Sequence, residues 1–190
     1  MLVLLLMFFL WKQVTLRRFG HHEVVELEIT LGGMGRMLIK PSYDEMRIAH
    51  KAWVELSTRK AGLLFDEEDD VIVEVYDSWY QLFREMRVLV KEIPIERIRT
   101  QKSTGQLVKV LIGALNKGLR PHLTRWQAKF RRWYEWRIEQ ENKNDGMLTP
   151  QELQREYPHY EQLKEELKII NVELIQYVNE LEKLAHGDKP

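Results

Sequence analysis

The sequence predicts a mainly α-helical protein, with an N-terminal membrane-anchor helix, a short β-hairpin and a bundle of four to five helices. The first eleven residues are all apolar, whereas the rest of the 190-residue chain is rich in charge. Later segments repeat apolar residues at helical spacing, and two of them begin with a capping box. We therefore divide the chain into an anchor (1–16), a juxtamembrane segment with the hairpin (17–41) and a cytosolic helical bundle (42–190).

The apolar segment 1–11 has the composition of a membrane helix but is too short for a complete span. Eleven helical residues cover about 16 Å, roughly half of the ~30 Å hydrocarbon core. We expect either that the helix extends further upstream or that several copies gather and thin the bilayer. A core segment and a signal peptide are the alternatives, but a signal peptide would carry its cations before the apolar run.

Cations and an aromatic residue follow the apolar segment directly. We assign to the membrane interface Trp11, Lys12, Arg17 and Arg18. By the positive-inside rule, these cations are expected to keep the bulk of the chain in the cytoplasm. The absence of cysteine agrees with a reducing compartment.

A hairpin is expected next, because residues 25–31 alternate apolar and polar side chains with a period of two. The glycines within 32–35 permit a tight reversal, and 36–40 returns as a second strand. An isolated hairpin is only marginally stable, so it should pack on the helices or pair with another subunit.

The first two bundle helices are expected over 42–61 and from about residue 66 to Pro94. Ser42 and Glu45 form a capping box at the start of the first helix. The acidic run DEEDD at 66–70 suits the positive end of the second helix's dipole.

A third helix is expected over 105–119 and a fourth after Pro121. Gly118 and Pro121 should break or kink the chain between them, because proline lacks an amide proton and clashes with the preceding turn.

The last helix is expected to begin at Thr149 and to run to about Ala185. Thr149 and Glu152 form a second capping box, with Pro150 at the first helical position. Its apolar residues recur at spacings of three and four over four heptads. Such a seam closes an intramolecular bundle or zips subunits together, and we favour the bundle.

The formal net charge is zero, but the charges are segregated along the chain. Residues 117–137 hold seven Lys/Arg and a single acid, whereas 138–190 hold twelve acids and six bases. Local fields, rather than the total charge, decide which ligand is attracted.

The basic segment 120–137 is the candidate surface for an anionic ligand. Cations along a helix follow a phosphate backbone, while aromatic planes stack on bases. The spacing i, i+4, i+7, i+11 gives a stripe of Arg125, Lys129, Arg132 and Trp136. The full predicted set for an oligonucleotide or phosphate is Arg120, His122, Arg125, Trp126, Lys129, Arg132 and Trp136. A solvated face whose cations pair with the acidic segments, and contact with anionic lipid heads, stay open as alternatives.

No catalytic residue, metal site or cofactor is predicted. Arg17 and His22 have the R-x-x-x-x-H spacing of HEPN ribonucleases, but they lie in the juxtamembrane segment, where arginines act as topology signals. His21 and His22 lack a third ligand at metal-site spacing, and His50 is expected to be a structural residue of its helix. The chain also lacks the P-loop, H-E-x-x-H and nucleophile-elbow motifs.

Four features in this order carry a family resemblance: the short anchor, the GGMG hairpin, RIAHKAWVELSTRKAG, and NKGLRPHLTRWQAKFRRWYE. The chain resembles small membrane proteins of bacterial anti-phage defence loci, and among them the membrane effectors of Hailong systems. The resemblance implies a homo-oligomeric channel in the lipid bilayer. It also implies that a single-stranded oligonucleotide, made by a partner nucleotidyltransferase, holds the channel shut. The apolar segment of this chain is shorter than a complete transmembrane helix, and in this respect the chain departs from the resemblance. A membrane-tethered scaffold without a ligand and a HEPN-like ribonuclease are the competing hypotheses.

Overall fold

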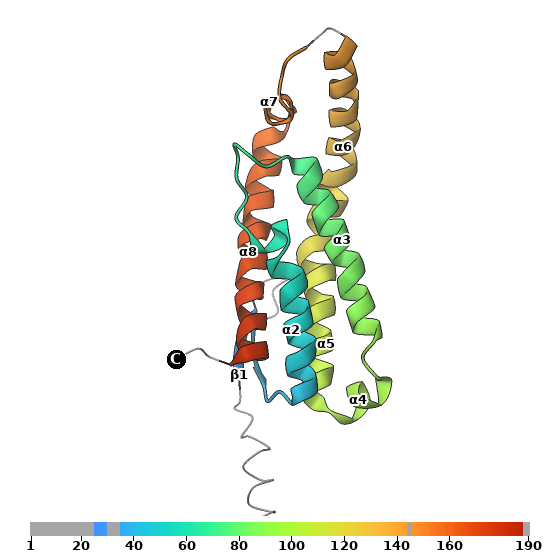
Figure 1. Ribbon diagram of the computed structural model, residues 1–190, viewed down its shortest axis with the longest axis vertical. Coiled ribbons are helices and arrows are strands. Elements are labelled where there is room, and N and C mark those ends of the chain that lie inside the picture. The colour runs from blue at the N-terminus through green and yellow to red at the C-terminus, as the bar shows by residue number, and fades with distance from the viewer. Residues whose placement is uncertain (1–24, 30–34, 144–145, 188–190) are drawn as a thin grey trace, which may run out of the picture.

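The computed structural model describes residues 25–29, 35–143 and 146–187, which form an elongated bundle of helices (Figure 1). The mainly helical class is confirmed. The long helices are α2 (Tyr43–Ser57), α3 (Ile72–Lys91), α5 (Lys102–Gly113), α6 (Arg120–Lys143) and α8 (Tyr160–His186). Within the described ranges, no helix is long and apolar enough to cross a membrane. The anchor and the interface residues Trp11, Lys12, Arg17 and Arg18 lie outside these ranges.

The two strands lie within the ranges expected for a hairpin. β1 (Val25–Ile29) and β2 (Gly35–Ile39) pair antiparallel, with Val25 opposite Ile39. β1 lies against α8 and β2 against α5, and the Ile39 side chain is completely buried. The strand pair is therefore attached to the helices of its own chain.

The capping box predicted at the start of α2 is present and also joins two helices. The Ser42 amide donates to the Glu45 carboxylate at 2.7 Å, and the Thr104 hydroxyl of α5 donates to the same buried carboxylate. Burial alone would raise the pKa of Glu45, but these hydrogen bonds hold it below its usual value. α2 ends at Ser57, earlier than predicted, and the short 3₁₀ helix η2 (Lys60–Gly62) follows.

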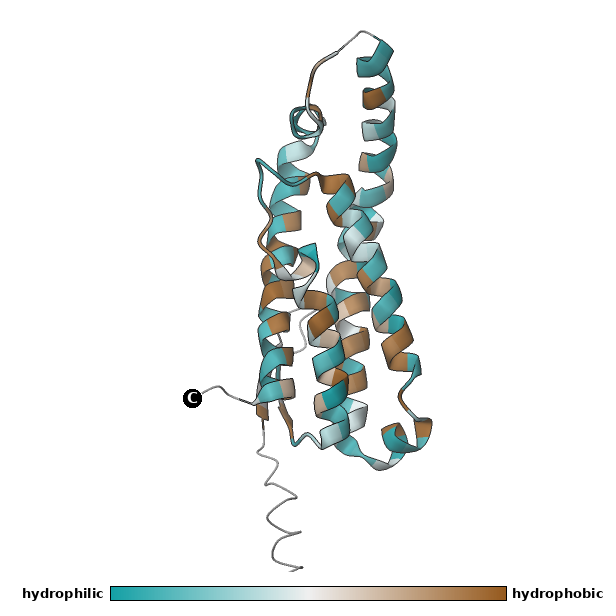
Figure 2. Ribbon diagram, in the orientation of Figure 1, coloured by the Kyte–Doolittle hydropathy of each residue, from teal (hydrophilic) through white to brown (hydrophobic). Residues whose placement is uncertain are grey.

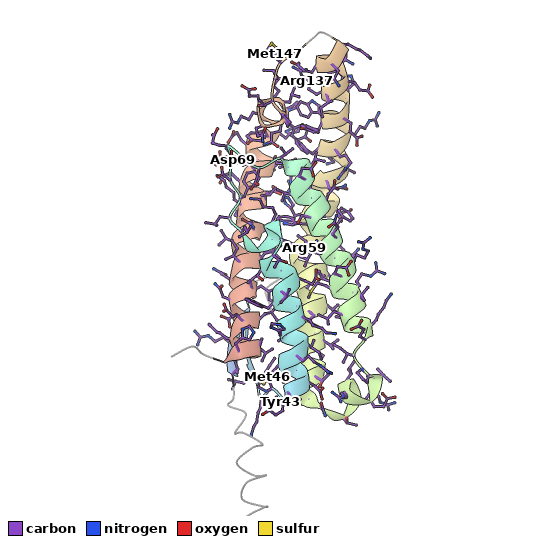
Figure 3. All side chains as sticks on the ribbon, viewed as in Figure 1. Tyr43, Met46, Arg59, Asp69, Arg137 and Met147 are labelled. Atoms are coloured by element: carbon purple, nitrogen blue, oxygen red, sulfur yellow. The ribbon has the colours of Figure 1, made fainter. Side chains whose placement is uncertain are left out.

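The prediction that the acidic run 66–70 starts a helix is wrong. These residues form a turn, and α3 begins at Ile72. The Asp66 carboxylate closes the turn locally by accepting from the Glu68 and Asp69 amides, and side chains of the C-terminal helices hold it from outside. Lys164 and Lys168 both contact Glu67, and the Asp69 carbonyl accepts from Gln151. Figure 3 shows Asp69 on this loop, beside α8.

Two buried amide side chains also hold the backbone on either side of the acidic turn. Asn171 of α8 accepts from the Phe65 amide at 2.8 Å and donates to the Leu63 carbonyl at 3.0 Å. Gln154 accepts from the Ile72 amide at 2.8 Å and donates to the Asp70 carbonyl at 2.9 Å. The loop therefore has its backbone groups satisfied without a helix.

The helix does not break at Gly118 and Pro121, where we expected a break or a kink. The helix runs without interruption from Lys102 to Lys143, because a π-helical segment, η3 (Ala114–Leu119), joins α5 to α6. A π turn is wider than an α turn and leaves a carbonyl without its usual donor. The wider turn leaves room for the Pro121 ring, and no hydrogen bond there depends on the amide proton that proline lacks.

The predicted last helix is divided into two. α7 (Pro150–Arg155) begins with the Thr149 capping box as predicted, and α8 begins only at Tyr160. Pro158 separates them, because a proline disfavours the helical conformation of the residue before it. A short helix after Pro94, α4 (Ile95–Thr100), was not predicted.

The heptad seam of α8 is buried within this one chain. Leu163, Leu167 and Leu181 are almost completely covered, and α8 packs along α2 for much of its length. Figure 2 shows hydrophobic residues where the helices of the lower bundle face one another, whereas the upper part of α6 is largely hydrophilic. The seam thus closes an intramolecular bundle, the alternative that we favoured.

Replacing Asn171 by alanine should lower the free energy of unfolding by about 2–3 kcal/mol, because the Phe65 amide and the loop carbonyls lose their partner. Urea unfolding of the full chain measures this. N179A, an exposed position on the same helix, is the matched control and should be close to neutral. Equal stability of the two variants would contradict the role given to Asn171.

Candidate anion-binding site

The structure divides the predicted ligand-binding residues of α6 between the core and the surface. His122 and Trp126 are buried. The His122 Nε2 atom and the Tyr76 hydroxyl are hydrogen-bonded at 3.0 Å, and the Trp126 indole donates to Glu166 at 2.6 Å. These two residues therefore pack α6 against its neighbours and do not line a surface for a ligand.

The predicted basic stripe is exposed but only partly available. Arg125 forms an ion pair with Glu166 at 3.0 Å, as the interpretation of a charge-paired solvated face expects. The other three side chains of the stripe are exposed, namely Lys129, Arg132 and Trp136. Neither Lys129 nor Arg132 has an ion pair among the residues that the structure describes. The stripe is thus reduced to three side chains on the outer side of a single helix.

Arg120 lies elsewhere, in a hollow of about 480 Å³ between α3 and the start of α6. We call this hollow the arginine groove. The side chains that give it its character are three arginines and two aromatics, namely Arg84, Arg87, Arg120, Tyr80 and Phe83. Among the described residues, no acidic side chain lines it. The groove therefore presents guanidinium groups beside aromatic surface, a combination suited to phosphates and bases.

Helical spacing explains why α3 contributes most of this lining. Tyr80, Arg84 and Arg87 lie four and then three residues apart, so they share one face of the helix. The adjoining face of α3 carries the fully buried Tyr76 and Trp79 into the core. Packing of the apolar face thus fixes the direction of the arginines.

Arg120 is positioned by two contacts on separate elements. Its Nε atom donates to the Asn116 side-chain oxygen at 3.0 Å, and its guanidinium carbon lies 4.9 Å from the Phe83 ring centroid. Stacking on an aromatic face is a preferred environment of guanidinium. The terminal guanidinium nitrogens of Arg120 form no hydrogen bond with the described residues, so their N–H groups can donate to a ligand.

The other two arginines differ in their partners. Arg84 forms an ion pair with its neighbour Glu85 at 3.1 Å, but its side chain is 73% exposed and such a pair is weak. Arg87 has no hydrogen bond or ion pair with any residue of the described ranges. Arg87 and Arg120 are consequently the two cations of the groove without a counter-charge among the described residues.

The sequence analysis found Arg120 but missed the contribution of α3. Arg84 and Arg87 were overlooked because that helix was interpreted through its apolar stripe alone. The signal was present, since Arg84, Arg87 and Lys91 recur at intervals of three and four on its polar face.

Histidine positions give no evidence of a metal centre in the described residues. His50 is not isolated, because its Nδ1 atom lies 3.0 Å from the Nε2 atom of His186 at the end of α8. Within 25–29, 35–143 and 146–187, no group of three or more potential ligands comes together. His21, His22 and Arg17 lie outside the described residues.

Comparison with protein-family models, with curated proteins and with solved structures finds no match to this chain. The site is therefore interpreted from its own geometry and charge.

The buried His122 makes the packing of α3 on α6 sensitive to acid. Desolvation by burial lowers its pKa to about 4, although the nearby Glu166 carboxylate opposes this shift. The imidazole is accordingly neutral in the folded protein at neutral pH. Because the unfolded chain binds this proton near pH 6.5, the stabilisation is complete above that pH and is lost as the pH falls towards 4.

We expect His122 to remove about 2 kcal/mol from the free energy of unfolding between about pH 7.5 and about pH 5. H122Q should lose less stability over this interval, because glutamine does not titrate. Urea unfolding at a series of pH values measures the difference between the two proteins. Parallel pH profiles would contradict the assignment of this proton to His122.

Proposed function

We propose that the bundle is a receptor for a phosphate-bearing ligand, a nucleotide or a single-stranded oligonucleotide, which binds in the arginine groove. The observation that carries this proposal is the convergence of Arg84, Arg87 and Arg120 on one hollow that has no acidic lining. Planar guanidinium groups match phosphate oxygens with paired hydrogen bonds, and Tyr80 and Phe83 offer ring surface beside them.

The apolar segment 1–11 supports placing this receptor at a bacterial membrane. In this proposal the protein is an oligomeric effector of anti-phage defence, of the kind that the sequence resembles. The short segment would form a channel or disrupt the bilayer only when several copies gather. The ligand, made by a partner nucleotidyltransferase, would control that step through the bundle.

A membrane-tethered scaffold is the second candidate function. Trp136 is 54% exposed beside Arg132, and tryptophan and arginine are the residues most enriched in binding hot spots. Met147 is 94% exposed at the tip beyond α6, above Arg137 (Figure 3). These side chains favour a protein partner at the far end of α6, and such a scaffold needs no ligand in the groove.

Reversing the two α3 arginines, in R84E/R87E, should weaken the binding of a short fluorescent single-stranded DNA by at least about tenfold. Each lost charge-assisted hydrogen bond is worth about 1.5–3 kcal/mol. Fluorescence anisotropy with the full chain in detergent, at several salt concentrations, measures the affinity, and the wild-type value should fall as salt rises.

K129E/R132E is the matched control, since it reverses two exposed cations on the stripe and leaves the groove intact. It should bind nearly as well as the wild-type protein. Loss of binding in K129E/R132E but not in R84E/R87E would move the site to the stripe. Absence of binding by the wild-type protein would leave the scaffold as the better proposal.

A further inference from the structure

The arginine groove does not end at Arg120 but adjoins a second hollow of about 270 Å³. Phe83, Arg87 and Arg120 line both hollows. The second hollow lies between α3 and the α5–η3 part of the long helix, and most of its remaining lining is apolar, from Val90, Ile112 and Leu115. The groove is thus directly continuous with a hollow whose remaining walls are mainly apolar, apart from Lys91 and Asn116.

We propose that the second hollow is a base pocket, which receives the nucleobase of the ligand whose phosphate contacts the arginines. This inference rests on the proposed function and narrows it. It requires a ligand in which a planar heteroaromatic ring lies one sugar away from a phosphate. A polyphosphate or an abasic strand would fill only half of the site.

The wall of the base pocket offers apolar contact to a flat ring. Ile112 is 41% exposed and Leu115 is nearly buried beneath it on the next turn, so the pocket wall offers hydrocarbon surface to a flat ring. Covering such surface removes it from water and favours binding. In the part of the chain that the structure describes, no acidic side chain lines this hollow, so no carboxylate there opposes a phosphate beside the ring.

Arg120 links the two subsites, because it lines both hollows. A guanidinium plane stacks on a base and its edge donates to phosphate oxygens. Since Phe83 and Asn116 already hold Arg120 in place, little of its freedom remains to be lost on binding.

Asn116 supplies a polar group at the edge of the base pocket. Its side-chain oxygen accepts from Arg120, which directs its amide nitrogen away from that bond. This nitrogen has no hydrogen-bond partner among the described residues, and Asn116 is one of the residues that line the hollow. Its donors suit the ring nitrogens and carbonyl oxygens of a base edge, whereas an acyl chain has no acceptor for them.

The test compares two ligands of equal length, a single-stranded DNA of mixed sequence and the same sugar-phosphate strand without bases. The full chain in detergent should bind the base-containing strand about tenfold more tightly, because stacking contributes about 1–3 kcal/mol per base. I112W should reduce the affinity for the base-containing strand to that for the abasic strand, since the indole fills the pocket. Affinity for the abasic strand should not change.

I169W is the matched control, because Ile169 is 59% exposed on α8 and lies outside both hollows. It should leave both affinities unchanged. Equal binding of the two strands by the wild-type protein, with no effect of I112W, would overturn the base pocket and leave the phosphate receptor standing. Binding of anionic-lipid vesicles that I112W abolishes, without discrimination between the strands, would overturn it in favour of a lipid. Failure to bind either strand would overturn both proposals.

Discussion

The uninterrupted helix from α5 through η3 to α6 is the constraint on which the candidate site depends. Because η3 widens the helix and does not break it, Asn116 and Arg120 stay on one rod, four residues apart. That rod packs against α3, which places Arg120 over Phe83. A break at Gly118, as local sequence rules predict, would have placed the two groups on separate elements and left Arg120 without its anchor.

What the sequence predicted correctly is local or periodic. The Ser42 and Thr149 capping boxes depend on residues three positions apart, and the α8 seam on a repeat that one helix contains. The errors arose where distant residues decide. The acidic turn is held by Gln154 and Asn171, more than eighty residues further along the chain, and no local rule contains such contacts. Among the ligand residues, His122 and Trp126 were grouped with their basic neighbours by composition, although their four-residue spacing continues to the buried Phe130.

Internal charge pairing explains how a chain of zero net charge presents a cationic groove. The acidic turn is neutralised by α7 and α8, where Lys164 lies 3.1 Å from Glu67 and Arg155 lies 2.7 Å from Glu68. On the last helix, Glu166 forms an ion pair with Arg125. These three acids are therefore paired within the fold, and Arg87 and Arg120 retain donors without an acidic partner in the described part of the chain. The total charge is a poor guide here because it counts pairs that cancel far from the site.

The contacts beneath the groove limit what a bound ligand can do to the bundle. α3 and α6 are already joined there by the Tyr76–His122 hydrogen bond and by the ion pair of Asp77 with Arg131. A ligand that bridges Arg87 and Arg120 therefore reinforces an existing interface and does not close an open one. Binding adds to the stability of the folded state, and this added free energy grows with the logarithm of the ligand concentration over its dissociation constant. Control of a membrane segment by such a ligand would then act on how the bundles assemble, because the two helices that the ligand bridges are already joined.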